Sequence, residues 1–353
     1  MKIKITDKGA VASRPGQMYA WPGMAKALNG DIVVAVSERK FHVDPFGREV
    51  VIRSRDNGYS WGLPQEVYNS EMDDRDGNML ALRDGRLVLS WFTSNAFEKD
   101  WPERAARVTD KMRKELLGTW MLVSNDNGYT WSETPKSIPA GMHVSPTELS
   151  DGSLLSIGFG NRFSGDDRSA LSILKSHDTG NTWDRISKID AVFKDENGNL
   201  IAHLDESHVL ETSPGNLIAL FRSVRGADGN GYLYQAFSSD YGNSWTLPHK
   251  TSIWGYPPHM LKLSSGAILC MCSHRRRPYG IVGVLSRDNG YSWDTENIFT
   301  IYSWDDEPDM GYPVSLEVAK DEILTVFYCK RDGIKDKNEE PEGLLYVRFK
   351  IEG

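Results

Sequence analysis

The sequence predicts an all-β fold, and three features of its 353 residues support that prediction. The chain carries 11 Trp, 14 Tyr and 12 Phe, and aromatic residues favour strands. It also carries 32 glycines, which favour the tight turns between strands. There is little helix-like periodicity, and two short motifs recur along the chain instead.

The first motif has the form Ser-x-Asp-x-Gly-x-(Ser/Thr)-Trp and occurs five times. Its Asp can accept hydrogen bonds from the backbone amides that follow, Gly supplies a positive φ, and the Ser/Thr hydroxyl closes the loop. We expect the Trp to pack under the turn as the next strand begins. Each copy therefore predicts a hairpin turn with a structural role. The copies are residues 54–61, 124–131, 176–183, 238–245 and 286–293.

The second motif is a turn followed by an apolar strand, and its six copies alternate with the first motif. They begin at residues 29, 84, 151, 214, 265 and 320. Six inner strands with five hairpins outside them describe a six-bladed β-propeller, formed by residues 1–353 as a single domain. The sixth unit lacks the hairpin motif and ends at residues 343–351. We expect an N-terminal strand near residues 2–6 to complete that blade and close the ring.

An insertion at about 97–118 interrupts the second unit. From Pro102 onward, Ala105, Val108, Met112 and Leu116 follow a helical spacing, which predicts a surface helix of three or four turns on a blade-two loop. This helix would be either one wall of the site or a solvated decoration.

Composition excludes several classes of function. A net charge of −8 argues against a dedicated binder of nucleic acid or of an anionic membrane. No run approaches 18 apolar residues, and the start of the chain lacks the apolar stretch of a secretory signal. That fits a cytoplasmic protein, or a secreted or periplasmic one whose signal was removed. Cys270, Cys272 and Cys329 have no metal-binding spacing, so we expect buried reduced thiols, no metal and no cofactor.

The five hairpin motifs resemble the Asp-box (BNR) repeats of the sialidase, or neuraminidase, superfamily, and the resemblance covers nearly the whole chain. Three further segments resemble that family more specifically. The resemblance implies that Tyr312, in 309–315, is the nucleophile and that Glu206, in 204–222, polarises it. Arg222, sixteen residues after Glu206, would bind substrate. It follows an apolar strand, which is an unfavourable place for an idle guanidinium.

In 273–281, Arg275 fits a second substrate-binding arginine best, with Arg276 and Arg277 as rivals. The family also carries an arginine on the first blade, where this chain has Ala20 within 19–22. Arg14 or Arg39 could substitute for it in space. This departure weakens sialic acid as the substrate and leaves a related, less acidic sugar open.

The resemblance implies an acid/base aspartate between the first inner strand and the first hairpin motif. Asp44 is the natural candidate. Asp73, Asp74 and Asp76, around Arg75 and one blade later, are alternatives, and a turn network explains that cluster equally well.

Five histidines lie near the predicted ends of inner strands. Each alone is typical of a hydrogen-bonded structural residue, but together they raise polysaccharide lyase chemistry, in which a His/Tyr pair abstracts a proton beside a uronate carboxylate. They are His42, His143, His208, His259 and His274.

The leading hypothesis is a sialidase-like retaining exo-glycoside hydrolase that acts on a terminal acidic sugar of a glycan. The alternatives are a lyase on uronate-containing glycans and a non-catalytic glycan-binding propeller. Trp21, Tyr279 and Trp304 are candidates to stack on sugar rings. Besides the residues named above, the substrate-binding set is expected to include Arg39, His42, Asp74, Arg75 and His259.

Overall fold

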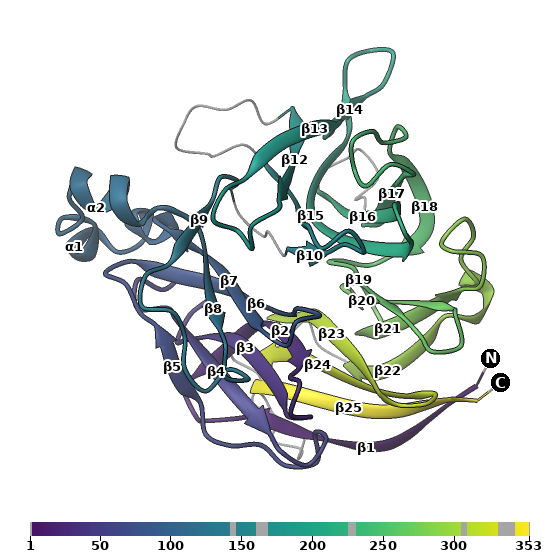
Figure 1. Cartoon of the computed structure of the whole chain (residues 1–353), viewed down its shortest axis with the longest axis horizontal. Helices are drawn as coiled ribbons and strands as arrows, with labels where there is room; N and C mark the ends of the chain where they lie inside the picture. Colours follow the sequence, from purple (N-terminus) through teal and green to yellow (C-terminus); the bar gives the residue numbers. More distant parts are fainter. Residues whose placement is uncertain are drawn as a thin grey trace.

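The computed structural model describes residues 2–141, 146–159, 169–224, 231–304, 309–330 and 343–352. Its strands form six antiparallel sheets, and these blades follow one another around a central axis (Figure 1). The predicted six-bladed propeller is therefore confirmed. No helix within these ranges is long and apolar enough to cross a membrane.

The first three blades have four strands each, ordered from the axis outward. Blade one contains β2 (Met18–Lys26), β3 (Ile32–Arg39), β4 (Arg48–Ser54) and β5 (Gln65–Tyr68). Blade two contains β6 (Asp73–Ala81), β7 (Leu87–Ser94), β8 (Gly118–Ser124) and β9 (Lys136–Ile138). Blade three contains β10 (Thr147–Glu148), β11 (Leu154–Phe159), β12 (Ala170–Ser176) and β13 (Asp184–Asp190).

The remaining blades follow the same order. Blade four contains β15 (Leu200–Ser213), β16 (Asn216–Val224), β17 (Tyr232–Ser238) and β18 (His249–Trp254), with β14 (Val192–Lys194) paired to the start of β15. Blade five contains β19 (His259–Lys262), β20 (Ile268–His274), β21 (Tyr279–Ser286) and β22 (Phe299–Trp304). Blade six contains β23 (Asp309–Ala319), β24 (Glu322–Lys330), β25 (Gly343–Glu352) and β1 (Lys2–Ala12).

The N-terminal strand closes the ring. β1 pairs antiparallel with β25, with Lys2 opposite Glu352 and Ala12 opposite Leu344. The prediction that residues 2–6 complete blade six is confirmed, and the strand continues to Ala12. The pairing joins the two ends of the chain in one sheet, so blade six depends on both of them (Figure 1).

The apolar strands predicted as inner strands lie second from the axis, which corrects the sequence analysis. Every residue of β3 and of β7 is buried. A continuous apolar run indicates a strand covered on both faces, and in a propeller the neighbouring blades provide that cover. The innermost strands precede the predicted turns and carry more polar residues, because they line the axis.

The five repeated motifs form the predicted hairpins, each between the third and fourth strands of a blade. Asp126 Oδ1 accepts the Thr130 backbone N–H at 2.8 Å, and Asp126 Oδ2 accepts its hydroxyl at 2.6 Å. Gly128 N–H donates to Ser124 Oγ at 2.7 Å. The five tryptophans pack against the blade cores as expected. In blade one the hairpin follows Ser54, which pairs with Ile32 at the start of β3, so it lies at the end of the blade opposite Arg39.

The insertion on blade two holds two short helices where one longer helix is predicted. η1 (Ala96–Lys99) leads into α1 (Pro102–Ala105), and α2 (Asp110–Leu116) follows. Thr109 interrupts the predicted helix because its backbone is extended and its hydroxyl caps α2 by accepting Met112 N–H at 3.2 Å. Val108 is buried with Phe97 in a small core of the insertion. A further 3₁₀ turn, η2 (Thr295–Asn297), lies in blade five.

Glu49, on β4, is a fully buried carboxyl between the first two blades. Ser37 Oγ donates to Glu49 Oε1 at 2.6 Å and accepts Asp76 N–H at 2.8 Å. A Cβ on Gly77 of blade two would overlap Glu49 Oε2, so the contact requires glycine there. Burial raises the pKa of Glu49 to about 8, and the carboxyl is therefore protonated at neutral pH.

Replacing Glu49 by Gln should remove a pH dependence of stability. Because the native pKa of Glu49 lies above its unfolded value, its contribution is complete below the unfolded pKa and is lost as the pH rises through about 8. Relative to wild type, Glu49→Gln should therefore gain on the order of 3 kcal/mol of unfolding free energy between pH 5 and pH 9. Urea unfolding at both pH values measures this gain, with exposed Glu133→Gln as the control. Parallel pH profiles of wild type and Glu49→Gln would show that Glu49 is ionised.

Candidate active site

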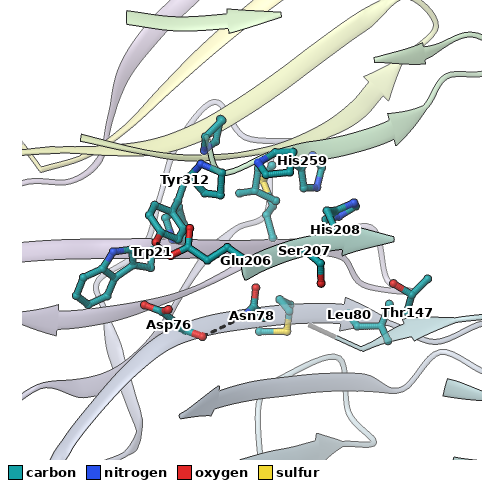
Figure 2. Close-up of a pocket in the computed structure, with 18 of the residues that line it drawn as sticks. Trp21, Asp76, Asn78, Leu80, Thr147, Glu206, Ser207, His208, His259 and Tyr312 are labelled. Carbon is teal, nitrogen blue, oxygen red and sulfur yellow. Dashed lines mark hydrogen bonds between the residues drawn. The ribbon is translucent and has the colours of Figure 1, made fainter. Parts of the chain in front are cut away.

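Four innermost strands have a β-bulge at corresponding positions, and the residue at each bulge has a positive φ. These residues are Trp21 (56°), Asp76 (61°), Glu206 (28°) and Tyr312 (52°). Residues other than glycine rarely adopt this left-handed backbone conformation, which is strained. Both strained backbone and β-bulges are concentrated at functional sites. All four residues line one cavity of about 270 Å³ on the propeller axis (Figure 2).

Tyr312, Glu206 and Arg222 meet at a single carboxylate oxygen. Tyr312 Oη donates to Glu206 Oε1 at 2.6 Å, and Arg222 Nη1 lies 2.5 Å from the same oxygen. Burial, followed by the charge of Glu206, raises the pKa of Tyr312 well above its ordinary value. The phenol is therefore neutral, and its proton points at a carboxylate that a guanidinium holds in place. Figure 2 shows the Glu206 side chain reaching toward Tyr312.

Arg275 joins Arg222 beside the tyrosine. The two guanidinium carbons lie 4.9 Å (Arg222) and 5.4 Å (Arg275) from the ring centroid of Tyr256, and that of Arg275 lies 6.0 Å from the ring of Tyr312. Within the described residues, no carboxylate forms an ion pair with Arg275, and its buried Nε and Nη2 have no hydrogen-bond partner. A buried cation without a counter-ion is suited to binding an anion.

The two rivals of Arg275 are exposed. Arg276 stacks on Trp254 at 4.2 Å, and Arg277 lies 5.7 Å from the ring of Tyr279. Of the three arginines, Arg275 is the one whose guanidinium lies near the Tyr312 ring in the described part of the chain.

The first blade has Ala20 where the resemblance implies an arginine, and Trp21 follows it. Ala20 is fully buried, and the Trp21 ring has the guanidinium carbons of Arg39 and Arg75 at 4.5 and 4.4 Å. Arg39 is buried in an ion pair with Asp73 at 2.9 Å and so does not reach the cavity. Arg14 is exposed and also lies outside the cavity.

Three more of the expected binding residues, Arg75, His42 and Asp74, lie in the part of blades one and two that surrounds Trp21. Arg75 Nη2 donates to the His42 carbonyl at 3.2 Å. The His42 ring lies 5.1 Å from Trp21 and pairs with Asp309 at 2.8 Å. Asp74 is buried and accepts the Thr93 hydroxyl at 2.6 Å, and burial raises its pKa to about 7.

Of the candidate acids, the structure places Asp76 and not Asp44 at the cavity. The Asp44 carboxylate is buried and accepts the backbone N–H of Lys40 at 2.6 Å and of Phe46 at 2.9 Å. It therefore fixes the 40–47 loop. Asp76 lines the cavity with Glu206 and Tyr312, and its charge contributes to the raised pKa of Tyr312.

Two of the five histidines come together in the cavity. The His208 and His259 rings are 4.6 Å apart, and Met260 N–H donates to His208 Nδ1 at 3.3 Å. Burial lowers the pKa of His208 to about 4, and burial with the nearby His208 lowers that of His259, so both are neutral at pH 7. His42 and His274 lie outside the cavity, and His143 falls outside the described residues.

Two tyrosines of the site were not predicted. Tyr256 lies beneath both arginines, and the triplet Gly-Tyr-Pro at 255–257, which repeats at 311–313, is the signal that could have found it. Tyr328 donates to Asp309 at 2.8 Å, and its ring lies 6.0 Å from Tyr312. Tyr328 ends an apolar strand, and no motif marks it.

No metal site is evident in the part of the chain that the structure describes, because no three His, Cys, Asp or Glu side chains gather there as ligands. Cys270, Cys272 and Cys329 are buried and unbridged, as expected. Burial raises the pKa of Cys272 to about 12, which makes it an inert thiol at neutral pH.

Several solved structures share this fold. A protein of unknown function from Dyadobacter fermentans is 21% identical, with a TM-score of 0.76 over 99% of both chains. The NanB sialidase of Streptococcus pneumoniae is 14% identical, with a TM-score of 0.68 over 99% of this chain and 70% of that one. The intramolecular trans-sialidase of Ruminococcus gnavus is 16% identical, with a TM-score of 0.66 over 97% of this chain and 96% of that one. At such identities the likeness establishes the fold alone.

Sequence comparison supplies the family. None of the curated proteins matches the chain. Residues 44–323 match the family model of the BNR repeat-like domain, a range that includes all five hairpin motifs. The chain therefore belongs to the BNR repeat-like family and has the six-bladed propeller fold of the sialidases.

Proposed function

We propose that this protein is a retaining exo-glycoside hydrolase of sialidase type, which removes a terminal acidic sugar from a glycan. The observation that carries the proposal is the hydrogen bond of Tyr312 to Glu206, with Arg222 on the same oxygen. The non-catalytic alternative predicts that these three side chains do not converge, and it is disfavoured for that reason.

In the proposed reaction Tyr312 Oη attacks the anomeric carbon while its proton passes to Glu206. The acid/base aspartate protonates the leaving-group oxygen as its bond to the anomeric carbon breaks, and a tyrosyl-sugar intermediate forms. Water then attacks the anomeric carbon and gives a proton to that aspartate, while the bond to Tyr312 Oη breaks and Glu206 returns its proton to Tyr312. A neutral phenol avoids the repulsion that a carboxylate nucleophile would meet at a carbon bearing a carboxylate. This advantage favours a sugar with its acidic group on the anomeric carbon, and sialidases are known exceptions to the two-carboxylate rule.

Arg222 and Arg275 would hold the acidic group of the sugar. Arg222 already shares its charge with Glu206, whereas Arg275 has no carboxylate partner in the described chain, so Arg275 would contribute the larger share of the binding. Trp21, next to the Ala20 that stands where the resemblance implies a third arginine, is 3% exposed and packs against Arg39 and Arg75, so it would shape the wall of the site.

The direct test is hydrolysis of 4-methylumbelliferyl α-N-acetylneuraminide and of the corresponding glucuronide, followed by proton NMR of the released sugar. We expect the first to be cleaved with retention at the anomeric carbon. A product that absorbs in the ultraviolet as a conjugated alkene would instead assign elimination, the lyase alternative. No release from any acidic glycoside would contradict the proposal.

Replacing Tyr312 by Phe should lower kcat at least about 10³-fold, because Phe has no nucleophilic oxygen while the ring packing is kept. Steady-state hydrolysis of the aryl sialoside measures the loss. Tyr291→Phe, on an exposed hairpin tyrosine, is the matched control and should keep wild-type activity. A Tyr312→Phe enzyme within tenfold of wild type would exclude the tyrosine nucleophile.

Asp76 and Asp44 can be separated as acid/base candidates by paired Asn variants. Asp76→Asn should lower kcat about 10²–10⁴-fold for a sugar leaving group, and less for an activated aryl group, which needs little protonation. Asp44→Asn should cost about 1–2 kcal/mol of unfolding free energy through its weakened loop hydrogen bonds and leave kcat within a few-fold. Kinetics with both leaving groups, together with urea unfolding, distinguish the two. The reverse pattern would return the acid/base role to Asp44.

A further inference from the structure

A cluster of two exposed phenylalanines, Phe41 and Phe46, and the half-buried Trp101, which we call the aromatic platform, lies beside the candidate site. We propose that this platform is a second carbohydrate site, which binds the sugar units to which the terminal acidic sugar is attached. The inference deepens the proposed function and rests on it.

The two phenylalanine rings of the platform face water, and the half-buried Trp101 packs beside them. Phe41 is 51% exposed and Phe46 is 60% exposed, and they are the large exposed phenylalanines of the described chain. The ring of Trp101 lies 5.8 Å from that of Phe41 and 6.2 Å from that of Phe46. Three aromatic rings from two loops thus form one continuous apolar surface, which is unfavourable in water unless a ligand covers it.

The platform lies at the same end of the blades as the two binding arginines. Its phenylalanines belong to the loop that follows β3 after Arg39, and Trp101 belongs to the insertion that follows β7. Arg222 and Arg275 occupy the equivalent strand ends of blades four and five. His42, in the same loop as the phenylalanines, packs on Trp21 of the cavity wall, so the loop joins platform and cavity.

The loop is held rigidly from beneath. The Asp44 carboxylate accepts the amides of Lys40 and Phe46, and Lys330 Nζ donates to the Lys40 carbonyl at 2.8 Å. Asp74 N–H donates to the Gly47 carbonyl at 3.1 Å. These bonds give buried Asp44 a role in presenting the phenyl rings. A surface ordered before binding loses little conformational entropy when a ligand arrives.

The chemistry of the platform suits the rings of a sugar chain. The faces of aromatic rings are apolar and electron-rich, and they complement the C–H groups on the face of a sugar ring. The Arg104 guanidinium carbon lies 5.4 Å from the Phe46 ring, and Lys330 Nζ lies 5.6 Å from the Phe41 ring. Arg104 also pairs with Glu71 at 3.2 Å, so charged and polar groups border the rings at the edge of the platform.

The size of the platform argues against a protein partner. Full burial of three aromatic side chains covers at most about 750 Å², and about half of each phenylalanine is already covered. A stable protein interface needs about 800 Å² from each partner. One or two sugar rings match the area better.

The test compares a long and a short substrate on Phe41→Ala/Phe46→Ala. We expect kcat/KM for 3′-sialyllactose to fall about 10-fold, while kcat/KM for methyl α-N-acetylneuraminide, which is too short to reach the platform, stays within twofold. Tyr291→Ala, an exposed aromatic at the opposite end of the blades, is the control and should change neither value. Equal losses on both substrates, or none, would overturn the proposal.

A binding measurement separates this inference from the proposed hydrolysis. Saturation-transfer NMR with lactose alone should show contact with wild type and lose it in the double variant, whether or not the protein cleaves sialosides. If the double variant melts early, Phe46→Leu, which keeps apolar bulk without the aromatic face, replaces it and should weaken the lactose signal. Light scattering that shows dimers of wild type but not of the variant would assign the platform to self-association and overturn the proposal.

Discussion

The left-handed backbone at the bulges of the innermost strands is the constraint on which the candidate site depends. Trp21, Asp76, Glu206 and Tyr312 reach the axis from there, and each such conformation costs on the order of 1–3 kcal/mol. Packing of whole blades against one another maintains it. A Cβ on Gly311, just before Tyr312, would overlap Ser273 Oγ of blade five, so the close approach of two blades fixes the strand that carries the tyrosine.

Charge in the site is divided between support and recognition. Arg39 and Arg75 lie against Trp21 and near Asp73, with nitrogen–oxygen distances of 2.9 and 3.7 Å, so blades one and two use their arginines in the wall. Arg222 is paired with Glu206, and Arg275 has no carboxylate partner among the described residues. In the proposed function, blades four and five therefore bind the anion. With Ala20 in place of the first-blade arginine that the resemblance implies, the proposed site has one fewer contact for an anion but keeps the positive charges of Arg222 and Arg275.

The sequence was sufficient for the propeller because five copies of one hydrogen-bonded hairpin repeat along it, and each copy folds by local rules. Glu206 and Tyr312 came from family resemblance, and the structure brings them to 2.6 Å. The sequence could not decide whether Asp44 or Asp76 is the acid/base residue, because both lie outside regular strand patterns. Only the fold reveals that backbone amides occupy the Asp44 carboxylate. The innermost strand of each blade was not identified from the sequence. A continuous apolar run marks a strand that is buried on both faces, and in this fold that is the second strand, such as β3 or β7.

The two cavity histidines bear on the choice between hydrolysis and elimination. A lyase base needs a free lone pair near the arginine that binds the substrate carboxylate. His208 Nδ1 accepts Met260 N–H, which leaves the proton of the neutral ring on Nε2, so His208 has no free lone pair with which to act as a base. Tyr312, in contrast, already has an acceptor for its proton in Glu206. The hydrogen bond of Tyr312 to Glu206 thus supports the proposed attack on carbon, with His208 as a neutral residue that lines the axial cavity.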